Sequence, residues 1–107
     1  MLNGRVNERM PFVLRHESTG EIAAAMLRNT YDFTYFGVKA WDAPEEAEAE
    51  REAFLAQWQY EDTPRWRVIE IDESKLKTLN VKLKNSPAYL VTLDAAGAVH
   101  AKLREEA

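Results

Sequence analysis

The chain has 107 residues, 46% of them apolar, which suits one domain with a hydrophobic core. It contains no cysteine, which excludes disulfides, thiolate metal sites and a cysteine nucleophile, and no run of about 18 apolar residues that would span a membrane. We therefore expect a soluble, cytoplasmic protein, with its net charge of −4 unevenly spread: residues 42–73 carry 11 acidic and 3 basic side chains, whereas residues 75–84 carry four lysines and no acid.

Residues 1–9 are polar and show no hydrophobic periodicity. They are expected to form a flexible N-terminal tail, followed by a single α+β domain over residues 10–107. Met1 and Met10 are equally sensible starts. The sequence has no repeat of 20–50 residues and no low-complexity tract, so nothing in it suggests a second structural unit.

The first predicted elements are two strands, at about 12–16 and 21–28, joined as a hairpin. Glu17 and Gly20 occupy the first and fourth places of a four-residue turn, in which glycine supplies the left-handed conformation. The second strand is apolar on both faces, which places it in the centre of a sheet, although its three alanines leave a helix as an alternative.

An aromatic segment follows, and it predicts a strand at 34–41. Because side chains alternate along a strand, one face would carry Phe36, Val38 and Ala40. The other face would carry Tyr35, Lys39 and Trp41. The first set is suited to the core, and the second set is suited to a binding surface.

One long helix is predicted at about 43–59. Asp42 would cap its first turn with Glu45 reaching back, and Pro44 lies early enough to lose no helical hydrogen bond. Projection at 100° per residue gives one stripe about 100° wide, the width expected of a helix packed on a sheet. The stripe contains Ala47, Arg51, Phe54, Leu55 and Trp58.

The second half of the chain predicts short elements only. After a strand at 65–71, Asp72 would cap a short helical turn near 73–79. Alternation of Val81 and Leu83 with lysines indicates an edge strand at 81–85. A hairpin of strands at 88–94 and 99–104 ends the chain. The predicted fold is a mainly antiparallel sheet of about 5–7 short strands packed on one long helix.

This fold leaves one face of the sheet without a cover. A single helix covers one face, yet the strands at 22–27 and 89–93 are apolar on both. The second face could be covered by curling of the sheet, by the aromatic loop 29–36 or by a second copy of the protein. Large exposed apolar patches usually mark interaction sites, so we expect a homodimer.

The candidate chemistry is sparse. His16 and His100, near Glu17 and Asp94, are the only histidines, and two histidines without cysteine make a poor metal inventory. We expect no metal, no cofactor and no catalytic residue. Arg51, on the packed stripe of the helix, has Glu70 as a natural partner in the sheet; alternatively it extends along the sheet with its charge in water.

The sequence predicts a small non-enzymatic binding protein that associates with itself or with another macromolecule. Its acidic helix face, formed by Glu45, Glu48 and Glu52, could engage a basic protein. One alternative is a ligand-binding domain or enzyme with a pocket between the aromatic segment 31–41 and the sheet. Its interaction surface would comprise Tyr31, Tyr35, Lys39, Trp41 and Arg51.

A second alternative is a single-strand nucleic-acid binder, in which bases stack on aromatic side chains and lysines follow the phosphates. The net negative charge and the absence of a nucleic-acid motif make this function the least favoured. The lysines concerned are Lys75, Lys77, Lys82 and Lys84.

Overall fold

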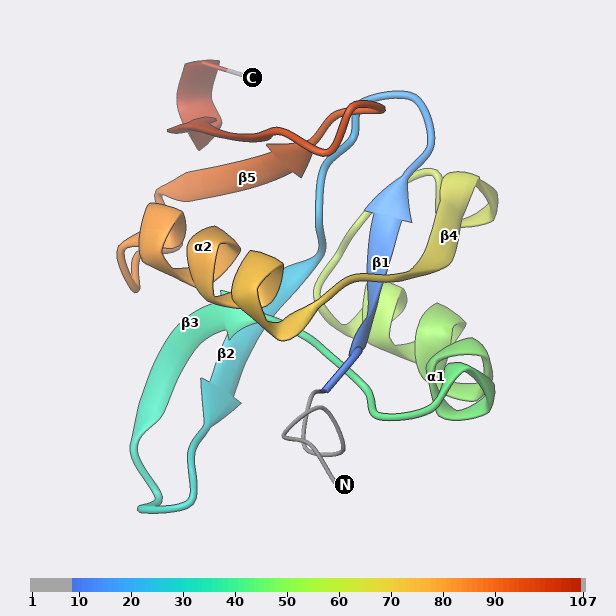
Figure 1. Cartoon of the computed structure of the whole chain (residues 1–107), viewed down its shortest axis with the longest axis horizontal. Coiled ribbons are helices and arrows are strands. Elements are labelled where there is room, and N and C mark those ends of the chain that lie inside the picture. The colour runs from blue at the N-terminus through green and yellow to red at the C-terminus, as the bar shows by residue number, and fades with distance from the viewer. Residues whose placement is uncertain (1–8, 107) are drawn as a thin grey trace, which may run out of the picture.

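The computed structural model describes residues 9–106, so the predicted tail lies, except for Arg9, outside the described residues. This part of the chain is an α+β fold of short antiparallel strands and two α-helices, shown in Figure 1. Neither helix is long and apolar enough to cross a bilayer. The strands are β1 (Phe12–His16), β2 (Ala24–Arg28), β3 (Thr34–Val38), β4 (Trp66–Glu70), β5 (Tyr89–Leu93) and β6 (Val99–Leu103), and the helices are α1 (Pro44–Gln57) and α2 (Glu73–Leu83).

The strands do not form the single sheet that the sequence predicted. They pair as three antiparallel two-stranded ladders, β1 with β4, β2 with β3, and β5 with β6. Isolated bridges join the ladders: Phe12 with Trp41, Arg15 with Ile22, and Glu21 with Thr92. The segment just before β2 therefore lies between β1 and β5, and the chain then turns away to pair with β3.

The first predicted hairpin turns where expected, but its turn spans five residues, His16–Gly20, and its ladder is wrong. Gly20 has a positive φ of 80° and its N–H donates to the carbonyl of His16 at 2.9 Å. Beyond this turn only Arg15 and Ile22 form a bridge, and the main partner of β1 is β4. The terminal hairpin of β5 and β6 is confirmed, with Gly97 at a φ of 88° in its turn.

Helix α1 lies within the predicted range, but Asp42 does not cap it. The N-cap residue is Ala43, in an extended conformation, and no side chain bonds to the first turn. The residue before a proline favours extended backbone, so Pro44 places the N-cap at Ala43, one residue after the predicted cap Asp42. Asp42 instead pairs with Arg9 at 3.2 Å.

Helix α2 replaces the predicted short turn and edge strand. Asp72 does cap it, since its side chain accepts the N–H of Lys75 at 2.6 Å. The helix then continues to Leu83, with Leu76, Leu79 and Leu83 buried on one side and Val81 72% exposed on the other. Spacing of the leucines at three and four residues outweighs the local alternation that indicated a strand.

The two helices cover opposite sides of the chain around β2. Ile22 and Ala24 belong to a core cluster with the leucines of α2. Ala23 and Ala25 belong to a second cluster with residues of α1, β1 and β4. The second apolar face is thus covered by α2, which is none of the three covers that the sequence suggested.

Candidate binding face of the β2–β3 hairpin

The structure brings together only some of the predicted interaction residues. Tyr35 and Lys39 line one hollow of about 330 Å³ on the β2–β3 hairpin. Tyr31 lies in the loop of this hairpin and is 79% exposed. Trp41 and Arg51 have other roles, described below.

Trp41 is a core residue. It is 5% exposed, its ring packs edge-on against Phe54 at 5.8 Å between centroids, and its Nε1–H donates to Glu50 at 2.9 Å. The Nζ of Lys39 lies 5.2 Å from the centre of the Trp41 ring. Trp41 therefore positions Lys39 at the surface through a cation–π contact, and its own buried ring does not form part of a binding surface.

Arg51 does not pair with a carboxylate of the sheet. It donates to the carbonyl of Thr63 at 3.0 Å and lies 3.6 Å and 3.8 Å from Glu48 and Glu52 on its own helix. Glu70 is exposed on β4. The prediction of an Arg51–Glu70 pair is wrong because nearer acids and the carbonyl of Thr63, which also accepts the N–H of Trp66, satisfy the guanidinium.

Helix α2 closes the outer edge of β3. The side-chain oxygen of Asn80 accepts the N–H of Val38 at 2.8 Å, and that of Asn85, just after the helix, accepts the N–H of Phe36 at 2.6 Å. On the same strand the Tyr35 ring lies over Gly37, where an added Cβ would be 2.7 Å from a ring carbon. The side chains of Asn80 and Asn85 thus accept the N–H groups of β3 that would otherwise pair with a neighbouring strand.

The outer edge of β2 is satisfied at one end only. The Tyr60 hydroxyl accepts the N–H of Ala24 at 2.8 Å and donates to its carbonyl at 2.9 Å. The N–H of Asn29 donates to the carbonyl of Phe33, so these two residues form a hydrogen-bonded pair of the antiparallel ladder. Because hydrogen-bonded pairs alternate along such a ladder, the N–H and C=O groups of Met26 and Arg28 point away from β3, as those of Ala24 do. Within residues 9–106 no hydrogen bond reaches these groups, so the edge is open there.

A hollow of about 310 Å³ lies beside the open edge, between β2 and α1. Its walls are mainly apolar, and two of its large side chains are partly exposed, Met26 at 44% and Trp58 at 36%. Trp58 was predicted in the buried stripe, but it follows the last helical residue and turns toward this hollow. The lining residues are Met26, Leu27, Lys39, Glu50, Ala53, Phe54, Gln57 and Trp58.

Three cations lie at the hollow that contains Tyr35. Arg9, Arg28 and Lys39 line it, and no acidic residue does. Arg9 pairs with Asp42 and Glu73, and Arg28 pairs with Asp32 at 2.8 Å, whereas Lys39 has no carboxylate within 4.0 Å among the described residues. Lys39 is therefore the cation of this hollow whose charge no described carboxylate neutralises.

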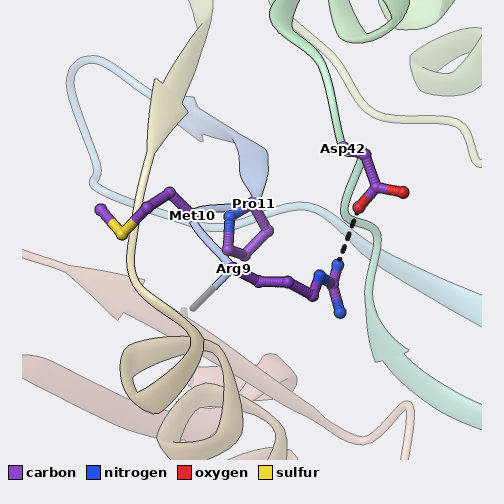
Figure 2. A pocket seen from close by; sticks show the side chains of 4 residues that line it. All are labelled: Arg9, Met10, Pro11 and Asp42. Atoms are coloured by element: carbon purple, nitrogen blue, oxygen red, sulfur yellow. Dashed lines mark ion pairs between the residues drawn. The ribbon is translucent and has the colours of Figure 1, made fainter. Parts of the chain in front are cut away.

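A larger hollow, of about 640 Å³, adjoins the Tyr35 hollow at Arg9, and Figure 2 shows the side chains that line it. The side chains of Arg9 and Asp42 face each other across it and form an ion pair at 3.2 Å. The remaining lining residues, Met10 and Pro11, are apolar. This hollow presents one neutralised pair and no arrangement suited to catalysis.

The histidines stabilise turns. His16 is 6% exposed, and its Nδ1 accepts the N–H groups of Ser18 and Thr19 at 3.1 and 3.2 Å. His100 lies 3.0 Å from Asp94, whose pKa is lowered mainly by a hydrogen bond from the N–H of Ala98. Among the described residues no group of three histidine, aspartate or glutamate side chains could hold a metal ion.

The predicted lysine surface is divided between different contacts. Lys75 donates to the carbonyl of Gly97 at 2.5 Å, and Lys84 lies 5.0 Å over the ring of Tyr89. Lys77 and Lys82 are exposed on α2. Leu76 and Asn80 are the residues of α2 that line the hollow with Tyr35, so these lysines do not gather with the aromatic side chains of the hairpin.

A partly buried polar group that the sequence analysis missed lies at the other side of β2. Burial raises the pKa of the Glu21 carboxyl, and Arg104, 3.5 Å away, partly offsets this. Burial also raises the pKa of the Tyr60 phenol. Tyr60 and Arg104 line a further hollow of about 380 Å³. Tyr60 follows a helix and Arg104 lies near the chain end, so the sequence gave no signal that these two side chains would lie close together.

Comparison of the chain with protein-family models, curated protein sequences and solved structures yields no match.

Proposed function

We propose that this protein is a non-enzymatic interaction protein whose binding face is the β2–β3 hairpin with the adjoining end of α1. The observation that carries the proposal is that four of the six large apolar side chains exposed within residues 9–106 lie on or beside the hairpin. Met26, Tyr31 and Phe33 lie on the hairpin, exposed by 44%, 79% and 69%, and Trp58 lies beside it. Apolar side chains grouped in this way usually mark a surface that another macromolecule covers.

The geometry of the Tyr35 hollow supports binding over catalysis. A ligand or enzyme pocket near the aromatic segment would need a histidine or Arg51 converging on Tyr31, Tyr35 or Trp41. The lining of the Tyr35 hollow includes neither a histidine nor Arg51. Lys39, the cation of this hollow without a carboxylate partner among the described residues, is of the kind that steers an encounter with an acidic partner.

Site-specific photo-crosslinking tests this function. We expect Tyr31→p-benzoylphenylalanine, expressed in its native cell, to give discrete covalent adducts on irradiation, either with another protein or with a second copy at twice 12.3 kDa. Val81 is exposed to a similar degree, 72%, but lies on α2, so Val81→p-benzoylphenylalanine is the matched control. Equal adduct patterns at the two positions, or none at Tyr31, would refute the hairpin as the binding face.

A further inference from the structure

We propose that the open edge of β2 binds an extended peptide segment of a partner protein as an added strand. The inference rests on the proposed function and specifies the partner's chemistry. The segment would place one large apolar side chain in the hollow between β2 and α1, with an acidic side chain next to it that pairs with Lys39.

The backbone of β2 defines where the added strand can pair. Met26 and Arg28 each turn an N–H and a C=O outward, and no hydrogen bond from residues 9–106 reaches them. At Ala24 the Tyr60 hydroxyl already occupies both groups, so pairing must stop there. The partner strand would therefore pair along Met26–Arg28 only, with alternating donors and acceptors that suit a peptide backbone and not a sugar-phosphate chain.

The side chains around this edge define the sequence of the segment. Alternate side chains of an added strand would point to the face of Leu27, into the hollow of about 310 Å³. Phe54, Ala53 and Trp58 provide apolar walls there, which suit a large apolar side chain.

Lys39 favours an acidic neighbour for that apolar side chain. It lines the hollow without a carboxylate partner among the described residues, whereas Arg28 on the edge is paired with Asp32 at 2.8 Å. Glu50, the acid of the hollow, keeps its charge and accepts the Nε1–H of Trp41. An aspartate or glutamate of the partner segment that reaches Lys39 would pair with this cation.

The test uses a positional-scanning library of capped hexapeptides as the probe, with binding measured by fluorescence anisotropy. We expect selection of a large apolar residue at one position and of Asp or Glu beside it. Met26→Pro removes the outward N–H and should weaken the selected peptide about tenfold, whereas Met26→Leu keeps that N–H and should stay within about twofold. N-methylation of alternate peptide nitrogens should weaken binding similarly, a readout that does not depend on how well the proline variant folds.

Other results would overturn the inference. A library without selected sequences, or equal binding by the proline and leucine variants with no effect of N-methylation, would exclude strand addition. A dimer in sedimentation that Met26→Pro disperses would make a second copy the occupant, and selective binding of single-stranded oligonucleotides would make it a nucleic acid. If the crosslinked adducts at Tyr31 persist when Met26→Pro is added, the proposed function stands and only the strand addition fails. If no adducts form at Tyr31 either with Met26 intact or with Met26→Leu, the proposed function itself is refuted.

Discussion

Tyr60 is the residue that closes one end of the β2 edge. Its hydroxyl satisfies both backbone groups of Ala24, at 2.8 and 2.9 Å, and its ring packs against Trp66 with 5.0 Å between centroids. Tyr60→Phe keeps the ring and leaves a donor and an acceptor without a partner. We expect the free energy of unfolding to fall by about 1–3 kcal/mol, measured by urea denaturation.

Tyr31→Phe is the matched control for this variant, because Tyr31 is 79% exposed. Its free energy of unfolding is expected to stay within about 0.5 kcal/mol of the parent value. A similar loss in both variants would mean that the Ala24 contact contributes nothing specific. Hydrogen exchange at the Ala24 amide gives a local check, since its protection should decrease in Tyr60→Phe alone.

Glu21 introduces a pH dependence into stability. Burial raises its pKa above 4.5, so the folded protein holds this proton more tightly than the unfolded chain does. The resulting stabilisation is complete below pH 4.5 and is lost as the pH rises through the folded-state pKa. Glu21→Gln cannot ionise, so its stability relative to the parent protein should increase from acidic to neutral pH. Urea denaturation across this pH range measures the difference in stability between Glu21→Gln and the parent protein. Glu46→Gln is the control, because Glu46 is exposed.

At the level of elements, the two predicted helix caps give a direct comparison. Asp72 accepts the N–H of Lys75 at the start of α2, whereas Asp42 makes only a surface pair with Arg9. Asp72→Ala should therefore cost about 0.5–2 kcal/mol of unfolding free energy, and Asp42→Ala about 0–1 kcal/mol. Thermal and urea denaturation would measure both. A larger loss for Asp42→Ala would contradict the assignment of Ala43 as the N-cap.

The sequence predicts an element correctly where one periodicity dominates. The strand at β4 and the hairpin of β5 and β6 are of this kind. Residues 73–83 carry two patterns at once, leucines at helical spacing and an alternation of Val81 and Leu83 with lysines. Burial of three leucines against β3, β5 and β6 decides for the helix, and such long-range contacts are not visible in a single sequence.

The candidate site was predictable only in part, for a similar reason. Tyr35 and Lys39 both line the hollow on the hairpin, but so do Val38 and Ala40, which the alternation placed on the opposite face. Trp41 follows the end of β3 and forms a bridge with Phe12, which turns it into the core. The open edge at Met26 depends on which strand lies beside β2 and on Tyr60 at Ala24, and neither is encoded locally.

For the molecule as a whole, the segment from Ile22 to Ala25 is shared by two half-cores. Ile22 and Ala24 contact the cluster under α2, and Ala23 and Ala25 contact the cluster under α1. No residue of this segment is more than 4% exposed. Loss of either cluster would expose one side of the segment, so we expect the two half-cores to unfold together.

Tryptophan fluorescence can test this coupling, because Trp41 and Trp66 belong to the cluster under α1 and Trp58 packs near Phe54 in it. Leu79 is fully buried in the other cluster, and Leu79→Ala should cost about 2–5 kcal/mol. If the half-cores are coupled, this variant shifts the urea midpoint of tryptophan fluorescence as far as that of helical circular dichroism, as Leu55→Ala does from the other side. A fluorescence midpoint that stays at the parent value while the dichroism midpoint falls would show two independent units. The shared segment would then be a linker, and β2 could move with one half-core without the other.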